Sequence, residues 1–219
     1  MSRRSKKLRQ VYLDTSAIVR EIEGDTDCAK AYFLIQEKVT RGSCKCFTSR
    51  FALMEALDQF KDDEYARERI IGGAPPRLVI RTLKQDRKLS EPNLAKVVKK
   101  LQDWETKYSR IIEVRGLSFK GFLRDIDPLE LPYVISLNSA IYAPDSIHLA
   151  YALFLGCDIF ISDDVQFRNQ INSAMQDKNS GLRKQALALL ESVVGPQLER
   201  KPTDKLWIPM VAVDFKAFR

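Results

Sequence analysis

The fold is indicated first by residues 144–162, which read Pro144-Asp-Ser-Ile-His-Leu-Ala-Tyr-Ala-Leu-Phe-Leu-Gly-Cys-Asp-Ile-Phe-Ile-Ser162. Pro and Asp favour a helix start, so a helix is predicted over 146–155, and Gly156 fits its C-terminal end. The apolar run at 158–162 predicts a buried strand, with another helix from about Val165. A helix, a tight turn and a buried strand in this order are typical of a parallel α/β sheet.

The same alternation of strand and helix occurs near the N-terminus. The patterns predict strands over 11–13 and 45–48 and helices over 16–23, 28–38 and 51–57, the last capped by Ser49. Repeated βα units bury their strands between helices. The predicted fold class is therefore α/β, with a parallel sheet covered by helices.

The rest of the chain is predicted to elaborate one domain, 1–219, whose core lies at about 10–62 and 140–170. Residues 63–139 are expected to form a mostly helical insert, and 175–206 a helical extension. Within them the patterns predict helices over 91–108, 128–139 and 182–193, a strand over 111–114 and a late strand within 207–213. Pro209 favours an edge position for the late strand, because proline cannot donate to a sheet.

Composition excludes several classes of protein. The 219 residues carry a net charge of +7 and include one His and four Cys. The cysteines show no C-x-x-C spacing, so buried free thiols are expected rather than a zinc or redox site. No stretch approaches the roughly 20 apolar residues needed to cross a membrane, and Asp14 interrupts the run after the basic N-terminus. We therefore predict a cytoplasmic protein that has no membrane partner and whose reactive groups are carboxylates or lysines.

Four acidic residues stand where folding alone does not require them. Asp14 ends the first strand, Asp164 follows the strand at 158–162, Glu55 interrupts an apolar run, and Asp145 opens an apolar helix. Strand ends form the ligand crevice of an open parallel sheet. Because isolated buried carboxylates are costly, a cluster of them indicates a hard cation such as Mg²⁺ or Mn²⁺.

Each acid also has a simpler interpretation. Asp14 and Asp145 are suitable helix caps, each worth about 1 kcal/mol, Asp164 is a suitable cap or loop residue, and Glu55 can turn to solvent. His148, three positions after Asp145, is interpreted as a structural residue rather than a metal ligand.

The four acids and their flanking residues resemble the PIN-domain ribonucleases, in particular the VapC-type toxins. The matching stretches are Val11-Tyr-Leu-Asp-Thr-Ser-Ala17, Thr48-Ser-Arg-Phe-Ala-Leu-Met-Glu-Ala56, Pro144-Asp-Ser-Ile-His-Leu-Ala-Tyr-Ala152 and Ile159-Phe-Ile-Ser-Asp-Asp-Val-Gln-Phe167. The resemblance assigns catalysis and metal binding to Asp14, Glu55, Asp145 and Asp164, with Ser16, Ser162 and Asp163 in support.

This resemblance implies a three-layer fold around a parallel sheet of about five strands. It implies a Mg²⁺- or Mn²⁺-dependent endoribonuclease in which water, activated by the cation, attacks the RNA phosphodiester. A toxin with a protein antitoxin and a homodimer are further expectations. The alternative is a noncatalytic PIN-like scaffold that binds RNA or a protein.

The positive charge of the chain is concentrated in two segments. Residues 1–10 have a net charge of +5 and residues 63–144 a net charge of +4, and both can hold an RNA backbone.

Overall fold

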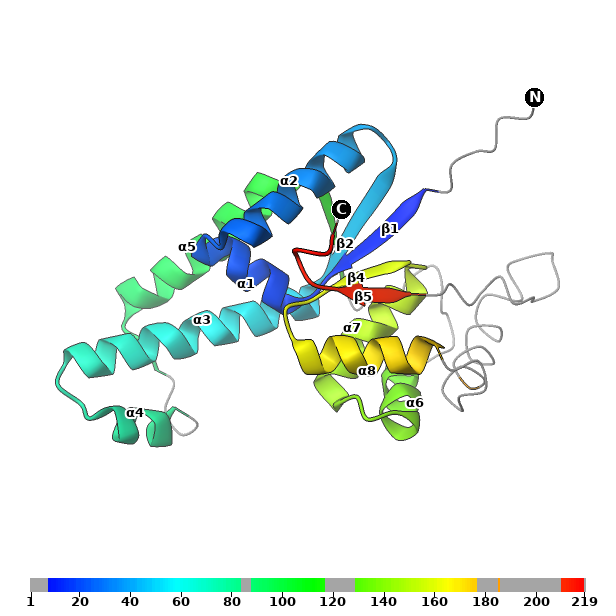
Figure 1. Cartoon of the computed structure of the whole chain (residues 1–219). Coiled ribbons are helices and arrows are strands. Elements are labelled where there is room, and N and C mark those ends of the chain that lie inside the picture. Colours follow the sequence, from blue (N-terminus) through cyan, green and yellow to red (C-terminus); the bar gives the residue numbers. More distant parts are fainter. Residues whose placement is uncertain (1–7, 84–87, 117–128, 177–184, 186–209, 219) are drawn as a thin grey trace, which may run out of the picture. The chain divides into compact units, whose positions relative to one another are not determined.

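Five short strands pair into one sheet, in which every neighbouring pair is parallel, in a computed structural model of the chain (Figure 1). The strands are β1 (Arg9–Leu13), β2 (Cys44–Ser49), β3 (Ile112–Arg115), β4 (Ile159–Ile161) and β5 (Val211–Val213). Their spatial order is β3-β2-β1-β4-β5. Strands β2 and β3 are added on one side of β1, and β4 and β5 are added on its other side. The strand order therefore reverses between β1 and β4. In open α/β sheets, ligands bind at this point of reversal.

The structure describes residues 8–83, 88–116, 129–176, 185 and 210–218. Its helices are α1 (Thr15–Glu23), α2 (Thr26–Thr40), α3 (Arg50–Ile71), α4 (Pro76–Thr82), α5 (Glu91–Tyr108), α6 (Glu130–Asn138), α7 (Ala143–Phe154) and α8 (Val165–Gln176). Gly156, after α7, has a φ of 64°. A glycine there avoids the steric cost that a side chain would carry, and it ends the helix as predicted.

The chain divides into two compact units. The sheet unit comprises residues 1–52 and 111–219, and the helical unit comprises residues 53–110. The single domain expected over 1–219 stays a prediction. Strand β3 falls inside the region expected as a helical insert, 63–139, and pairs with β2 at one edge of the sheet.

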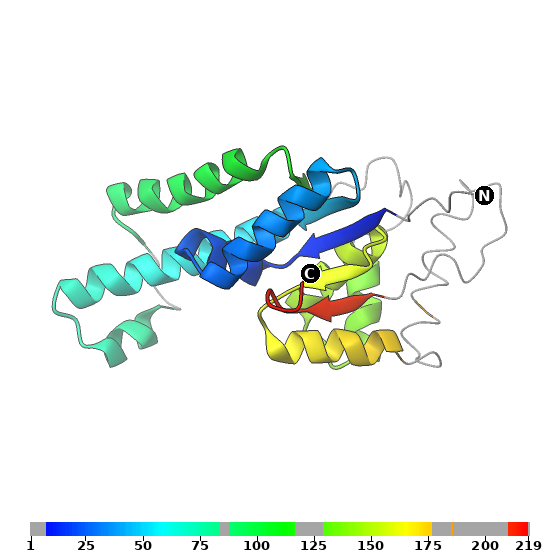
Figure 2. The ribbon, with the colours of Figure 1, turned by 45° about the horizontal axis from the view of Figure 1, so that its top comes forward.

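Helices cover both faces of the sheet in the sheet unit. Helix α2 contacts β2 on one face, and α8 contacts β5, while α7 packs on α6 (Figures 1 and 2). The row Phe47, Tyr12, Phe160 and Ala212 runs across four strands in register and is buried against apolar residues of α6, α7 and α8. This arrangement confirms the prediction of a three-layer α/β fold with a five-stranded parallel sheet.

Strand β5 lies at the other edge of the sheet, as Pro209 predicted for a late strand, although 207–209 lie outside the described residues. The side-chain amide of Asn172, on α8, forms hydrogen bonds with the edge of β5 that faces away from β4. The amide donates to the carbonyl oxygen of Ala212 at 3.0 Å and accepts from the N–H of Ala212 at 2.8 Å. Both outward-facing backbone groups of Ala212 are therefore occupied, which protects the edge from another strand.

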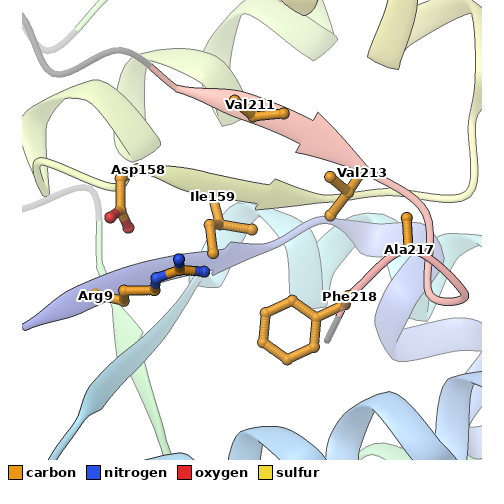
Figure 3. A pocket seen from close by; sticks show the side chains of 7 residues that line it. All are labelled: Arg9, Asp158, Ile159, Val211, Val213, Ala217 and Phe218. Carbon is orange, nitrogen blue, oxygen red and sulfur yellow. The ribbon is translucent and has the colours of Figure 1, made fainter.

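A hollow of about 320 Å³ lies on one sheet face, over β1, β4 and β5 (Figure 3). Its apolar residues are Ile159, Val211, Val213, Ala217 and Phe218, and its charged residues are Arg9 and Asp158. Val211 is 53% exposed, whereas Phe218 is buried and lies under the ammonium group of Lys38, 4.6 Å from the ring centroid. None of the predicted acids lines this hollow.

The helical unit contains an antiparallel pair formed by α3 and α5. Asn93 donates to Glu68 at 3.0 Å and Lys96 bonds Glu64 at 2.7 Å. One turn further along, the ammonium group of Lys100 lies 5.3 Å from the ring centroid of Phe60. The partners run in opposite directions along the two helices, which identifies a helical hairpin.

Most predicted elements are confirmed. Helix α5 has the predicted bounds, and its residues Val97, Leu101, Trp104 and Tyr108 are buried on one face. All four cysteines are free and buried, as expected. The predicted helix at 182–193 and most of the extension at 175–206 lie outside the described residues. Among those that are described, no helix has both the length and the apolar character needed to span a bilayer.

Candidate active site

The candidate site lies where the carboxyl ends of β1 and β4 meet. Asp14 directly follows β1, and its backbone N–H donates to the carbonyl oxygen of Ile161 in β4 at 3.0 Å. Ser162 directly follows β4 and is fully buried. Because the strand order reverses here, this pair of strand ends is the expected ligand crevice of the sheet.

Asp14 is a buried carboxylate, with 6% of its surface exposed. Its Oδ2 accepts hydrogen bonds from Ser162 Oγ at 2.7 Å and from Ser16 Oγ at 3.1 Å. Asp14 precedes α1, but its side chain makes no capping hydrogen bond to that helix. Asp14 thus occupies the N-cap position of α1, but capping does not account for its carboxylate, which bonds the two serines instead. The two hydroxyl groups hold the carboxylate in one orientation and offset part of the cost of burying its charge.

The same two hydroxyls also organise the chain after β4. Ser16 Oγ accepts from the N–H of Asp163 at 2.8 Å, and Ser162 Oγ accepts from the N–H of Asp164 at 3.1 Å. The two Oγ atoms are 3.3 Å apart. Ser16 and Ser162 thus connect Asp14 to the segment that carries Asp163 and Asp164. The family resemblance expects a supporting role for both serines.

Asp163 and Asp164 have different surroundings. The Asp163 carboxylate forms an ion pair of 2.5 Å with Arg20, so its charge is compensated. Asp164 is exposed, and its Oδ1 accepts from the N–H of Phe167 at 2.9 Å, which caps the start of α8. The interpretation of Asp164 as a helix cap is therefore confirmed. One carboxylate oxygen is used by the cap, and the bond fixes the direction of the group.

Asp145 reaches this region through α7. It lies in the first turn of the helix and is half-buried. His148, one turn later, places its Nε2 3.7 Å from Asp14 Oδ1. Residues three apart lie on the same side of a helix, so the Asp145 side of α7 is the side that faces the end of β1.

Glu55 belongs to the helical unit, where it is the sixth residue of α3 and half-buried. The structure links Asp14 to the Asp163–Asp164 segment and to the face of α7 that carries Asp145, all within the sheet unit. Within the described ranges, no three Asp, Glu, His or Cys side chains stand in an arrangement ready to hold a metal ion. The chemistry of the donors, all of them carboxylate oxygens, suits a hard divalent cation.

Four further side chains around Asp14 make contacts that were not predicted. Tyr12 OH lies 3.0 Å from His148 Nδ1 and donates to Ser49 Oγ at 2.9 Å, and Thr15 Oγ1 lies 3.4 Å from His148 Nε2. Burial raises the pKa of Tyr12 well above its ordinary value, and the charge of Asp14 raises this pKa further, so Tyr12 stays a hydrogen-bond donor. A useful signal in the sequence was present: a tyrosine and a histidine in apolar segments each need a partner.

A charged pocket of about 360 Å³ borders the site. It is lined by Arg20, Asp25, Asp27, Asp163, Val165, Arg168, Asp214, Phe215 and Lys216. Its cations are paired: Arg20 bonds Asp163, and Arg168 Nη2 lies 3.9 Å from Asp214. Arg168 also donates to the carbonyl oxygen of Ser162 at 2.7 Å, which anchors α8 to the end of β4. The pocket has no surplus of positive charge with which to attract an anion.

The chain matches no protein-family model, and neither a curated protein nor a solved structure shows significant similarity to it.

Proposed function

We propose that the protein is a divalent-metal-dependent endoribonuclease that hydrolyses RNA phosphodiester bonds. The observation that carries the proposal is the buried carboxylate of Asp14 at the reversal point of the sheet. Two serine hydroxyls orient it, and no lysine or arginine among the described residues pairs with it. Asp163, two residues after β4, has Arg20 as a partner. A buried acid without such a partner favours binding of a cation.

Mg²⁺ or Mn²⁺ would be held by Asp14, Asp145 and Asp164, and the family resemblance adds Glu55 as a fourth ligand. The bound cation would supply acidification of a water molecule and neutralisation of the charge that develops on the phosphate. Ser16 and Ser162 would keep Asp14 oriented toward the cation, and the N–H of Phe167 would do the same for Asp164. This chemistry needs no histidine base, which agrees with a chain that has only one His.

The RNA strand would be held by the positive charge outside the acidic segments, at 1–10 and 63–144. Four buried free thiols are compatible with the cytoplasm, where we place the reaction. The resemblance to VapC-type toxins also suggests a protein antitoxin and a homodimer. Neither is needed for the chemistry proposed here.

A noncatalytic scaffold that binds RNA or a protein is the second candidate. It is favoured by Asp164, whose carboxylate already caps α8, and by Asp163, which is already paired with Arg20. Thermal unfolding separates the two candidates, because a ligand that binds only the native state must stabilise it. An increase in melting temperature with millimolar Mn²⁺ supports the nuclease, and an unchanged value supports the scaffold.

The proposed activity is tested directly with the purified full-length chain. Total RNA is incubated with the protein and Mn²⁺ or Mg²⁺, and the cut ends are mapped by sequencing. We expect discrete internal cuts that require the metal and disappear in EDTA. Cuts that persist in EDTA, or intact RNA at all metal concentrations, would contradict the proposal.

A further inference from the structure

Three buried polar residues connect the elements around Asp14, and we call Tyr12, Ser49 and His148 the buried triad. Tyr12 and Ser49 are fully buried, and His148 is 1% exposed. They come from β1, from the end of β2 and from α7. Ser49 Oγ also accepts from the N–H of Ala52 at 3.0 Å, which caps α3 as predicted. One line of contacts thus runs from Asp14 through the triad to the start of a helix.

The hydrogen-bond directions assign a role to each ring nitrogen of His148. Tyr12 donates its hydroxyl hydrogen to Ser49, so its oxygen can accept from His148 Nδ1, 3.0 Å away, in the tautomer that carries its hydrogen on Nδ1. The other ring nitrogen, Nε2, then faces Asp14 Oδ1 at 3.7 Å and Thr15 Oγ1 at 3.4 Å. Asp14 is therefore held by serines at one oxygen and faces the imidazole at the other.

Aromatic rings surround the triad. The Tyr12 ring stacks on Phe160 with centroids 5.2 Å apart, and the Phe51 ring lies 5.1 Å from the imidazole. These rings enclose the triad in close-packed apolar surroundings, and the hydrogen bond between Tyr12 and His148 adds a fixed direction and distance to that packing. The bond between Tyr12 and His148 therefore sets the position of α7 along β1.

The position of α7 matters for the site because of what each element carries. Tyr12 lies two residues before Asp14 on β1, and His148 lies three residues after Asp145 on the same side of α7. Fixing Tyr12 against His148 therefore fixes the end of β1 against the start of α7, where the two aspartates stand.

We infer that the buried triad is a positioning device for the metal site, in which His148 acts through Asp14 and Asp145 and does not itself bind the cation. The inference rests on the proposed function. Outer partners that orient metal ligands typically change metal affinity 10- to 100-fold when they are removed. Loss of the triad is thus expected to weaken Mn²⁺ binding by about 10- to 100-fold while the acids themselves stay in place.

The test uses the full-length chain and Mn²⁺ as the probe, with the dissociation constant measured by calorimetry. The variants are His148→Phe, which removes both nitrogens, Tyr12→Phe, which removes one oxygen, and His148→Gln, which restores a donor to Tyr12. The matched control is Tyr65→Phe, because Tyr65 is a buried tyrosine on α3, in the helical unit and outside the triad.

We expect His148→Phe and Tyr12→Phe to weaken Mn²⁺ binding, His148→Gln to recover part of it, and Tyr65→Phe to match the unaltered protein. In RNA cleavage, kcat should fall more than KM changes. The double variant, with Tyr12→Phe and His148→Phe together, should have about the same Mn²⁺ dissociation constant as the single variant that binds less tightly. This is expected because the two residues act as one unit. Tyr12→Phe conserves volume, so it tests the inference even if His148→Phe does not fold.

Two results would overturn the inference. One is a dissociation constant within twofold of the unaltered protein for Tyr12→Phe. The other is an equal loss in Tyr65→Phe, which would identify a general effect of removing a buried tyrosine hydroxyl. Failure of the unaltered protein to bind Mn²⁺ is a different outcome, since it would refute the proposed function itself and the inference with it.

Discussion

Replacement of Ser162 by alanine tests the hydrogen bonds of the site, because the fully buried Ser162 hydroxyl bonds two different groups. Its Oγ donates to Asp14 Oδ2 at 2.7 Å and accepts from the N–H of Asp164 at 3.1 Å. A hydrogen bond to a charged group contributes about 1.5–3 kcal/mol, and the N–H left without its partner adds to the loss. We expect Ser162→Ala to lower the free energy of unfolding by about 2–4 kcal/mol.

The assay is urea unfolding followed by circular dichroism, with Ser173→Ala as the control. Ser173 is exposed on α8, and surface substitutions of this kind usually change the free energy of unfolding by less than about 0.5 kcal/mol. Ser16→Ala should give an intermediate loss, because Ser16 is only half-buried and its bond to Asp14 is longer, at 3.1 Å. A loss for Ser162→Ala no larger than that of the control would refute the hydrogen-bond arrangement around Asp14.

Two other predictions concern parts of the fold outside the site. The bond to Lys96 holds the pKa of Glu64 below its ordinary value of 4.5, so its contribution to stability is complete at neutral pH and is lost as the pH falls below 4.5. The unaltered protein should therefore lose more stability between pH 6 and pH 3 than Lys96→Met, and equal losses would contradict the pairing. At the sheet edge, Asn172→Leu leaves both backbone groups of Ala212 without their partner, so it should lower the free energy of unfolding by about 1–3 kcal/mol and promote aggregation. Static light scattering checks the second effect, and a monodisperse variant of unchanged stability would contradict it.

The sequence was most informative where local signals are strong. The strands around Tyr12, Phe47 and Phe160 are apolar runs that end in polar residues, and both features can be read without knowledge of the fold. Helix α3 was predicted over 51–57 but extends to Ile71. Its second half is highly charged and shows no apolar stripe. Pairing with α5, for example between Glu64 and Lys96, supplies the interactions that local sequence does not show.

Some contacts of the candidate site could be predicted from the sequence and others could not. The family resemblance placed Ser16 and Ser162 beside Asp14, and the parallel pairing of β1 with β4 is what brings the three residues together. The contact between Tyr12 and His148 could not be predicted, since it joins residues 136 positions apart and depends on how α7 packs against β1. Asp163 has an ion pair with Arg20 and Asp164 has a capping bond to α8, whereas the choice of Asp164 as the metal ligand comes from the family resemblance.

The central claim is that Asp14 holds the cation for RNA cleavage. The most direct measurement is the Mn²⁺-dependent cleavage rate of Asp14→Asn, a substitution that keeps the shape of the side chain and removes its charge. Asp158→Asn is the control, because Asp158 is an aspartate at the opposite end of the sheet, where it accepts from the N–H of Gln10 at 2.8 Å. We predict that Asp14→Asn lowers the rate by more than about 100-fold, beyond the usual effect of losing an outer partner of a metal ligand, and that Asp158→Asn matches the unaltered protein. A folded Asp14→Asn protein that cleaves RNA at the unaltered rate would contradict the claim.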